Sequence, residues 1–365
     1  MLPYGRQSID ESDIEAVAAV LRSDWLTTGP AVTAFEADLA RISGVSGVVS
    51  VSSGTAALHV AYAAMGVGTG DEVITTPLTF ISTASCASLL GAKVVFADIC
   101  EDTGNLDPQA VSAAMTSRTR VVAGVDYGGH PIDAAALTEI AHAGDALLLE
   151  DAAPSIGGSL DGQPVGSLAD VTTFSFFPTK NLTTAEGGAV VSRLDGVVDR
   201  ARKFRSIGLV RDPALLRLTD EGPWHQEVHT FGLNYRLPDL LCVLGSSQLP
   251  KVPGFKARRD AITARYNQGL SGIDVLRLPA CREGADPMWH LYPLRIRDGR
   301  RRSRTCGRTT LACRSTTCPS TGTPCTPTSA TSAAPAPSPR STTRRRSRCP
   351  CSPPSPMMTS TALST

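Results

Sequence analysis

The chain has 365 residues, of which 42% are hydrophobic, and a formal net charge of +1. That length and composition support one or two domains with a packed core. The near-neutral charge hides a split, because residues 301–365 contain 10 Arg and no Lys, Asp or Glu. The first 300 residues therefore hold 25 of the 35 basic groups and all 34 acidic groups, a net charge of −9. Such an acidic body gives no electrostatic reason to expect nucleic-acid binding.

Neither a metal site nor a membrane segment is predicted. Four cysteines are scattered over the first 300 residues without the spacing of a zinc site, as in a reduced cytoplasmic protein. No window approaches the roughly 18 apolar residues of a membrane span. The first ten residues, "MLPYGRQSID", lack the apolar core of a secretion signal. We therefore expect a cytoplasmic protein that holds no metal and contacts no membrane.

Strands and helices are predicted to alternate along the first 192 residues. Two helices come first, at 10–23 and 30–42. Seven strands follow, at 47–53, 71–77, 93–99, 119–127, 146–153, 171–177 and 187–192, and helices at 54–66, 83–92, 107–115 and 133–144 separate the first five. This alternation predicts an α/β fold with a mixed, mostly parallel sheet and helices on both faces. In such sheets the ligand binds at the carboxyl ends of the strands.

The turn "SSGTAAL" follows the first strand and opens a helix. Gly54 lets the backbone approach a ligand closely, and the N–H groups from Thr55 onward point outward at the positive end of the helix dipole. This arrangement predicts a phosphate-binding cradle. An ordinary helix cap formed by serine or threonine is the alternative.

Four further residues follow the ends of other strands. Asp151 ends the buried strand "ALLLED", where a carboxylate needs a cation such as a protonated pyridine nitrogen, although a salt bridge or helix cap is the alternative. Lys180, in "SFFPTKN" with Ser175, would condense with an aldehyde if its pKa were lowered, although an isolated lysine is usually a solvated surface charge. Phe80, after "TTPLT", is placed either to stack on a flat ring or to pack in the core. Their order, with Lys180 29 positions after Asp151, favours one shared site.

Eight stretches match one known family. They are "LTTGPAVTAFE", "SSGTAALH", "TTPLTFISTA", "VDYGGHP", "EDAAPSIGG", "SFFPTKNLTTAEGGAV", "GLNYRLPDLLCVLGSSQL" and "WHLYPLRI", and they cover nearly all of residues 1–297. On them the chain resembles the DegT-type nucleotide-sugar aminotransferases. The resemblance implies the type I (aspartate-aminotransferase) fold, with a large domain at 1–249 that binds pyridoxal 5′-phosphate (PLP). A small C-terminal domain would begin at 250–302.

The resemblance also implies a reaction and its residues. Lys180 matches the lysine that holds PLP covalently and moves the proton, Asp151 the contact to the pyridine nitrogen, and Phe80 the ring-stacking position. L-Glutamate would donate the amino group to a nucleotide-linked 4-keto-6-deoxy sugar. The stretches "MLPYGRQSIDESDI" and "TTPLTF" are most similar to members that aminate C4 of a UDP-linked N-acetylhexosamine in pseudaminic acid synthesis. Another UDP- or dTDP-linked keto-sugar is the alternative.

The phosphate contacts implied by the resemblance involve two subunits. Gly54, Thr55 and Ser175 match contacts made within one chain. Asn234, in "LNYR", matches an asparagine that reaches the phosphate held by the neighbouring subunit. That position implies a homodimer with shared active sites.

Three positions depart from the family pattern. Pro154, Phe177 and Ile207 stand where the family commonly has His, or at the first position His or Gln. Proline has no donor, so a contact to the cofactor's ring hydroxyl is put in doubt at Pro154. The presence of Lys180 argues against a non-catalytic relative and against a sugar dehydratase of the family, which usually has His there.

The composition changes abruptly after residue 302. Residues 303–365 contain 12 Ser, 15 Thr and 10 Pro but no aromatic residue, Ile or Val, so they cannot form a core. One interpretation is a basic tail through which the chain binds an anionic partner. The other is a shifted reading frame, because the neighbouring frame permits "QVNYLPVYWHPVYAD" over 313–328 and "EELSLPLFPA" over 344–354, both matching the family's C-terminal signature. We favour the second, which predicts a truncated small domain and a poorly soluble or inactive chain.

Overall fold

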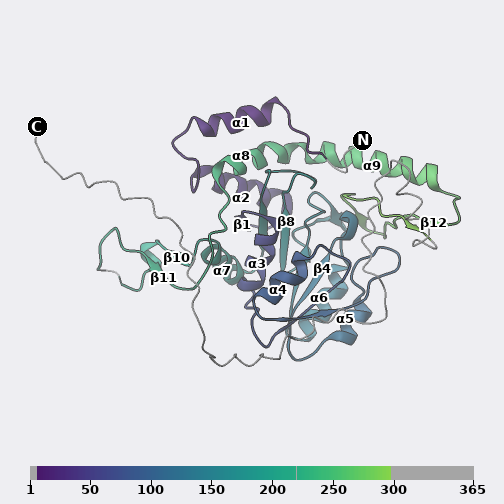
Figure 1. The fold of residues 1–365 in the computed structure, drawn as a ribbon, viewed down its shortest axis with the longest axis horizontal. Coiled ribbons are helices and arrows are strands. Elements are labelled where there is room, and N and C mark those ends of the chain that lie inside the picture. The colour runs from purple at the N-terminus through teal and green to yellow at the C-terminus, as the bar shows by residue number, and fades with distance from the viewer. Residues whose placement is uncertain (1–5, 219, 297–365) are drawn as a thin grey trace, which may run out of the picture. The chain divides into compact units, whose positions relative to one another are not determined.

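The computed structural model describes residues 6–218 and 220–296 (Figure 1). A sheet of seven strands in the order β1-β9-β8-β5-β4-β2-β3 forms its centre. The strands are β1 (Gly47–Val51), β2 (Glu72–Thr75), β3 (Lys93–Phe96), β4 (Thr119–Val125), β5 (Leu147–Asp151), β8 (Val171–Ser175) and β9 (Gly188–Ser192). The predicted tail at 303–365 lies outside the described residues.

The sheet is mixed and mostly parallel, as predicted. β3, β2, β4, β5 and β8 pair in parallel, whereas β9 runs antiparallel to both β8 and β1. All five residues of β8 are buried, and so are four of the five in β5. Strands covered on both faces lack a polar side, which explains their nearly continuous apolar sequence.

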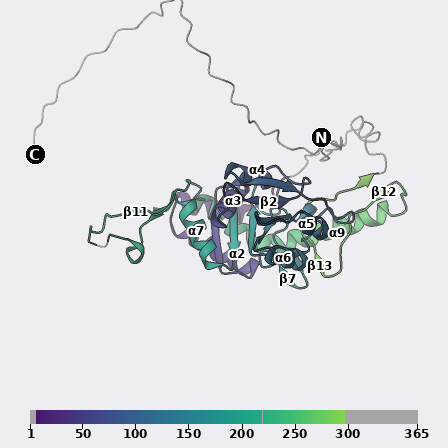
Figure 2. The same cartoon turned by 90° about the horizontal axis from the view of Figure 1, so that it is seen from below.

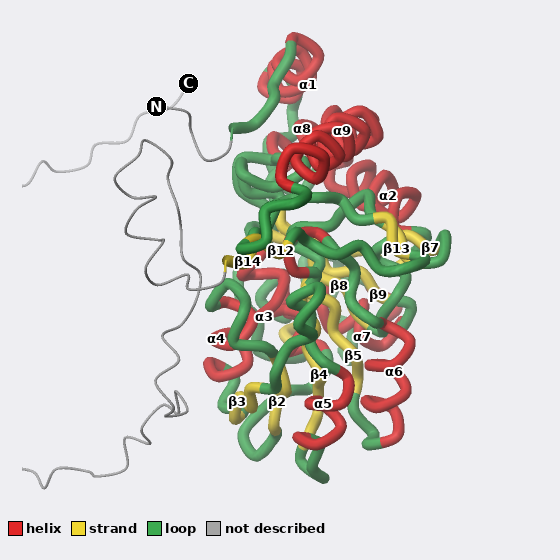
Figure 3. The backbone as a smooth tube through the Cα atoms, turned by 90° about the vertical axis from the view of Figure 1, so that its right-hand side faces the viewer, coloured by secondary structure: helices red, strands yellow, loops and turns green. Residues whose placement is uncertain are grey.

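Helices cover both faces of the sheet (Figures 1 and 3). α3 (Gly54–Ala64), α4 (Ser82–Leu89) and α7 (Asp195–Arg205) share a core with Val49 and Val121, on one face. α2 (Pro30–Ser43), α5 (Pro108–Ala114), α6 (Ala134–Ala143) and α8 (Asp239–Gln248) cover the other face, with Val48 and Val122. Consecutive residues of one strand point to opposite faces, so each apolar strand contributes to both cores.

The helix before this unit is held to it by polar contacts. α1 (Glu11–Leu21) lies beside α8 in Figure 1, and its Asp13 is buried. The carboxylate of Asp13 accepts hydrogen bonds from Ser247 at 2.6 Å and Gln248 at 2.7 Å, and pairs with Lys251 at 2.8 Å. A buried carboxylate with these partners is fully satisfied.

The chain after α7 adds smaller elements. β10 (Leu209–Val210) and β11 (Glu227–Val228) form a ribbon that projects away from α7 (Figure 2). Further along are α9 (Val252–Leu270), the pair β12 (Leu276–Arg277) and β14 (Arg295–Ile296), and β13 (Ala285–Asp286). β13 pairs with β6 (Ser159–Leu160), which also pairs with β7 (Gln163–Pro164). The 3-10 turns are η1 (Tyr127–Gly129), η2 (Pro213–Leu215) and η3 (Leu249–Lys251).

The predicted boundary at residue 249 stays a prediction. The β13–β6 pairing connects the segment after it to the large domain, so the two parts are in contact. The predicted strand 146–153 ends earlier, at Asp151, because the Asp151 side chain accepts the Ala153 N–H at 3.3 Å and closes a turn. Within residues 6–218 and 220–296, no helix combines the length and the apolar character needed to span a membrane.

Candidate active site

Three strand ends bring most of the predicted site residues to one edge of the sheet. β5 ends at Asp151, β8 ends at Ser175 and leads into the loop with Lys180, and β1 is followed by α3, which begins at Gly54. β1, β5 and β8 run in the same direction, since β9 is antiparallel to both of its neighbours. Side chains from distant parts of the sequence therefore meet at their carboxyl ends.

Gly54 and Ser175 face each other at close range. A Cβ atom on Gly54 would lie 2.7 Å from Cβ and 2.8 Å from Oγ of Ser175. Ser53 caps α3 by accepting a hydrogen bond from the backbone N–H of Ala56 at 3.0 Å. The Ser175 hydroxyl thus lies beside the first turn of a helix, where backbone N–H groups are available to an anion.

Thr55 extends the same cradle toward α4. Its Oγ1 lies 2.8 Å from Oγ of Ser82, so this hydrogen bond joins the first turns of α3 and α4. The side chains of Thr55 and Ser82 are thereby held in place before any ligand arrives. The arrangement suits a phosphate group, and the individual contacts to phosphate stay a prediction.

Asp151 is buried at the end of β5, with 5% of its surface exposed. Its Oδ2 accepts a hydrogen bond from the Thr83 hydroxyl at 2.7 Å. Burial raises the pKa of Asp151, and the hydrogen bond from Thr83 and the charge of Lys180 both oppose that rise. A carboxylate in this position gains from a cationic partner such as a protonated ring nitrogen.

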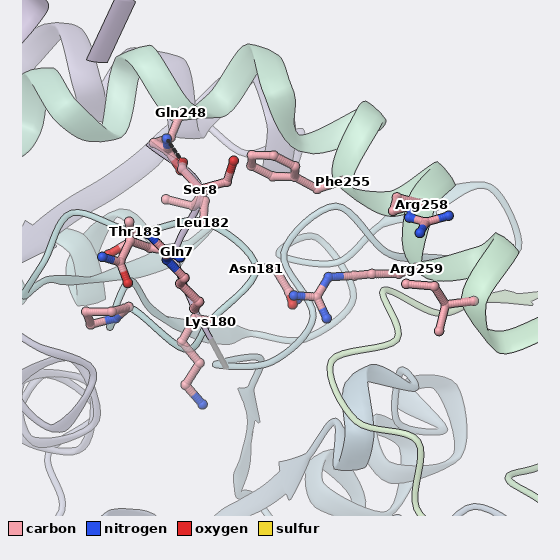
Figure 4. Close-up of a pocket in the computed structure, with 13 residues that line it drawn as sticks. Gln7, Ser8, Lys180, Asn181, Leu182, Thr183, Gln248, Phe255, Arg258 and Arg259 are labelled. Carbon is pink, nitrogen blue, oxygen red and sulfur yellow. Dashed lines mark hydrogen bonds between the residues drawn. The ribbon is translucent and has the colours of Figure 1, made fainter. Parts of the chain in front are cut away.

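Lys180 lies in the turn after β8, where its backbone N–H donates to the Phe177 carbonyl at 2.8 Å. Burial lowers the pKa of its amine, and the charge of Asp151 offsets part of that shift. A lower pKa increases the unprotonated fraction, which is the form that condenses with an aldehyde. Figure 4 shows the side chain pointing away from α9, with the amine at its far end.

Phe80 and Asn234 are exposed, as Thr55 is, whereas Gly54, Asp151, Ser175 and Lys180 are partly or fully buried. Phe80 is 74% exposed, and its carbonyl accepts a hydrogen bond from Thr83, the residue that also binds Asp151. Asn234 forms a β-bridge with Ser206. Over the described ranges, no hydrogen bond connects Asn234 to the other predicted site residues. Its contact to a second subunit therefore stays a prediction.

The three departures from the family pattern differ in their surroundings. The backbone carbonyl of Pro154 accepts a hydrogen bond from the Asn181 side chain, so this position supplies an acceptor instead of a donor. Phe177 is 45% exposed. Ile207 has a φ of 58°, in the left-handed region that is strained for a β-branched residue.

Sequence reasoning missed four residues around this site: Thr83, Asn181, Arg259 and His290. Thr83, Asn181 and His290 lie within the matched stretches, but nothing in those stretches indicated their hydrogen-bond partners. Asn181 is 3% exposed, and its Oδ1 has no hydrogen-bond partner in the described part of the chain. The same holds for Nδ1 of His290. Arg259 lies on α9, away from any strand end.

A pocket of about 320 Å³ lies between the Lys180 loop and α9 (Figure 4). Lys180 and Asn181 line it from the loop, and Arg258 and Arg259 line it from α9. A second pocket of about 370 Å³ shares Arg259 with it. The predicted site is therefore approached from a cleft that apolar and several cationic side chains line.

These residues fit pyridoxal phosphate. Gly54 leaves space beside Ser175 that a Cβ atom would fill, at the first turn of a helix. Asp151 offers a buried carboxylate to a ring nitrogen, and Lys180 offers an amine with a lowered pKa to an aldehyde. When bound, the cofactor supplies an electron sink for the substrate's Cα carbon.

The chain belongs to the DegT/DnrJ/EryC1/StrS aminotransferase family, whose model matches residues 7–314. It is an aminotransferase with the fold of the PLP-dependent sugar aminotransferases, and its cofactor is PLP. The family, the fold, the aminotransferase activity and the cofactor expected from the sequence are thereby confirmed.

Relatives from several organisms support the assignment. The spore coat polysaccharide biosynthesis protein SpsC from Bacillus subtilis is 39% identical over 295 residues, which cover 81% of this chain and 76% of SpsC. The UDP-4-amino-4,6-dideoxy-N-acetyl-beta-L-altrosamine transaminase from Campylobacter jejuni is 36% identical over 297 residues, covering 80% and 76%. The structure of Spr1654 from Streptococcus pneumoniae in its PLP form is similar with a TM-score of 0.74, at 29% identity over 81% of this chain and 78% of that one.

Proposed function

We propose that this aminotransferase moves the amino group of L-glutamate to C4 of a UDP-linked 4-keto-6-deoxy-N-acetylhexosamine. The observation that carries the proposal is the 36% identity, over 80% of the chain, to a transaminase named for the 4-amino-4,6-dideoxy product of such a reaction. The product would serve a surface polysaccharide or glycan, as the similarity to SpsC supports. The enzyme would work in the cytoplasm.

Lys180 and Asp151 have distinct tasks in this proposal. Lys180 would hold the cofactor through its amine, and the same amine, when free, would accept and return the proton at the substrate carbon. The lowered pKa of Lys180 suits this proton transfer, because burial increases the unprotonated fraction of the amine, which is the form that accepts a proton. Asp151, held by Thr83, orients the ring and favours its protonated nitrogen.

The test is incubation of the purified chain with PLP, L-glutamate and candidate UDP- and dTDP-linked keto-sugars, followed by mass spectrometry of the product. Formation of 2-oxoglutarate and of an amino-sugar from the UDP-linked 4-keto-6-deoxy-N-acetylhexosamine is expected. Preference for a dTDP-linked sugar would instead favour the alternative substrate. A Lys180→Ala variant that kept the visible absorption band of lysine-bound PLP would contradict the role of Lys180.

We also propose a homodimer in which Asn234 completes the partner's phosphate site. Support comes from large apolar side chains exposed near Asn234, since such surfaces usually pack against another protein. Phe231 is 93% exposed, Trp224 77% and Val228 58%. These residues lie on or next to the β10–β11 ribbon.

A complementation experiment tests the shared site. Lys180→Ala and Asn234→Ala subunits would each form inactive or weakened homodimers. Mixed dimers would contain one site with both residues intact, so activity should return when the two variants are refolded together. No recovery, despite mixed dimers in native mass spectrometry, would exclude a site shared through Asn234.

A further inference from the structure

In the described part of the chain, a half-buried arginine on α9 has no carboxylate partner. The guanidinium of Arg259 donates from one nitrogen to the Trp289 carbonyl at 2.9 Å and to the His290 carbonyl at 3.5 Å. Burial lowers its pKa. Across the described residues, no Asp or Glu lies within ion-pair distance of it. A cation partly removed from water without a counter-ion is a favourable place for an anion.

The position of Arg259 places that anion in the substrate cleft. Arg259 lines both pockets described above, so an anion at its side chain is in reach of either one. Arg6 also lines both, and Arg258 lines the first. Figure 4 shows Arg259 reaching from α9 toward Asn181, next to the Lys180 loop.

Two neighbouring side chains have unused polar atoms in the same region. Oδ1 of Asn181 and Nδ1 of His290 are buried and without a hydrogen-bond partner in the described residues. The pKa of His290 falls to about 3, first through burial and then through the charges of Lys180 and Arg259. His290 is therefore neutral and adds no charge to the cleft around Arg259.

We infer that Arg259, assisted by Arg6 and Arg258, binds the diphosphate of the nucleotide-linked substrate. The inference rests on the proposed function and deepens it. Guanidinium groups match the oxygen pairs of phosphates. The amine of Lys180 points away from α9, and this separation suits a hexose whose C1 carries the diphosphate while C4, on the opposite side of the ring, reacts.

The second pocket provides a surface for the nucleobase. Trp289, Tyr266 and Tyr292 line it, and the rings of the two tyrosines lie 5.0 Å apart between centroids. Aromatic side chains stack on bases irrespective of their identity. A nucleoside diphosphate would thus place its base on these rings and its phosphates at Arg259.

The experiment measures UDP binding to the PLP-loaded full chain by calorimetry, without a keto-sugar. Arg259→Gln should weaken UDP binding at least about 10-fold and reduce its dependence on salt concentration. The matched control is Arg265→Gln, an exposed arginine on the same helix, which should bind UDP like the wild type. Inorganic pyrophosphate should bind more weakly than UDP but show the same sensitivity to Arg259→Gln.

Several outcomes would overturn the inference. One is a UDP affinity that Arg259→Gln leaves unchanged. Another is an Arg259→Gln variant that loses binding of glutarate, a mimic of the amino donor, but keeps its binding of UDP. If Arg259→Gln unfolds, Arg259→Met keeps an unbranched side chain but removes the charge and the donors, and an unchanged UDP affinity in that variant would count equally against the diphosphate site. The proposed amination is tested separately, since UDP can bind through Arg259 whether or not a keto-sugar is aminated.

Discussion

Replacing Gly54 by alanine tests the phosphate cradle directly. The added Cβ would lie 2.7 Å from Cβ of Ser175, closer than non-bonded carbon atoms approach, and 2.8 Å from its Oγ. Rotation of Ser175 can move Oγ but not Cβ, so β8 or α3 must shift. Overpacking of this kind costs about 1–3 kcal/mol, and the methyl group would also occupy space intended for the phosphate. The dissociation constant of PLP should therefore rise about 5- to 150-fold.

PLP titration followed by visible absorption measures this change, with thermal unfolding of the cofactor-free protein as a second measurement. Gly68→Ala is the matched control, because no atom lies within 4 Å of a Cβ built there and its φ is not positive. The double variant Gly54→Ala with Ser175→Gly should recover stability but not PLP affinity, since the hydroxyl is gone. PLP affinity equal to wild type in Gly54→Ala would refute the proposed cradle.

Two further predictions come from the structure and one from the sequence. Asp151→Asn should lower the pKa of the Lys180 amine further in cofactor-free protein, because the charge of Asp151 opposes the lowering caused by burial. The rate of reductive methylation of Lys180 as a function of pH measures this pKa, and an unchanged or higher value would contradict the prediction. Ile207→Asn should raise the free energy of unfolding by about 1 kcal/mol, because asparagine tolerates the positive φ at this position better than isoleucine. The control is Ile273→Asn at an exposed position without a positive φ, which should not raise the free energy of unfolding, and urea denaturation measures both variants. Restoring the reading frame after residue 302 should increase soluble yield and specific activity, and equal values for both chains would argue that the tail is native.

The sequence by itself was sufficient for the fold class and the family. The alternation of strands and helices predicted the mixed sheet, because apolar strands buried on both faces have a recognisable composition. The rule that ligands bind at the carboxyl ends of parallel strands then selected Gly54, Asp151, Ser175 and Lys180. Each was ambiguous alone, and their order along the chain resembled a known family.

Only the tertiary structure decided which residues touch. The contact of Gly54 with Ser175 and the hydrogen bond from Thr83 to Asp151, across 68 residues, depend on the strand order of the sheet. Hydrophobic periodicity does not encode that order. The lowered pKa values of Lys180 and Arg259 likewise come from burial, which is set by packing between segments far apart in sequence.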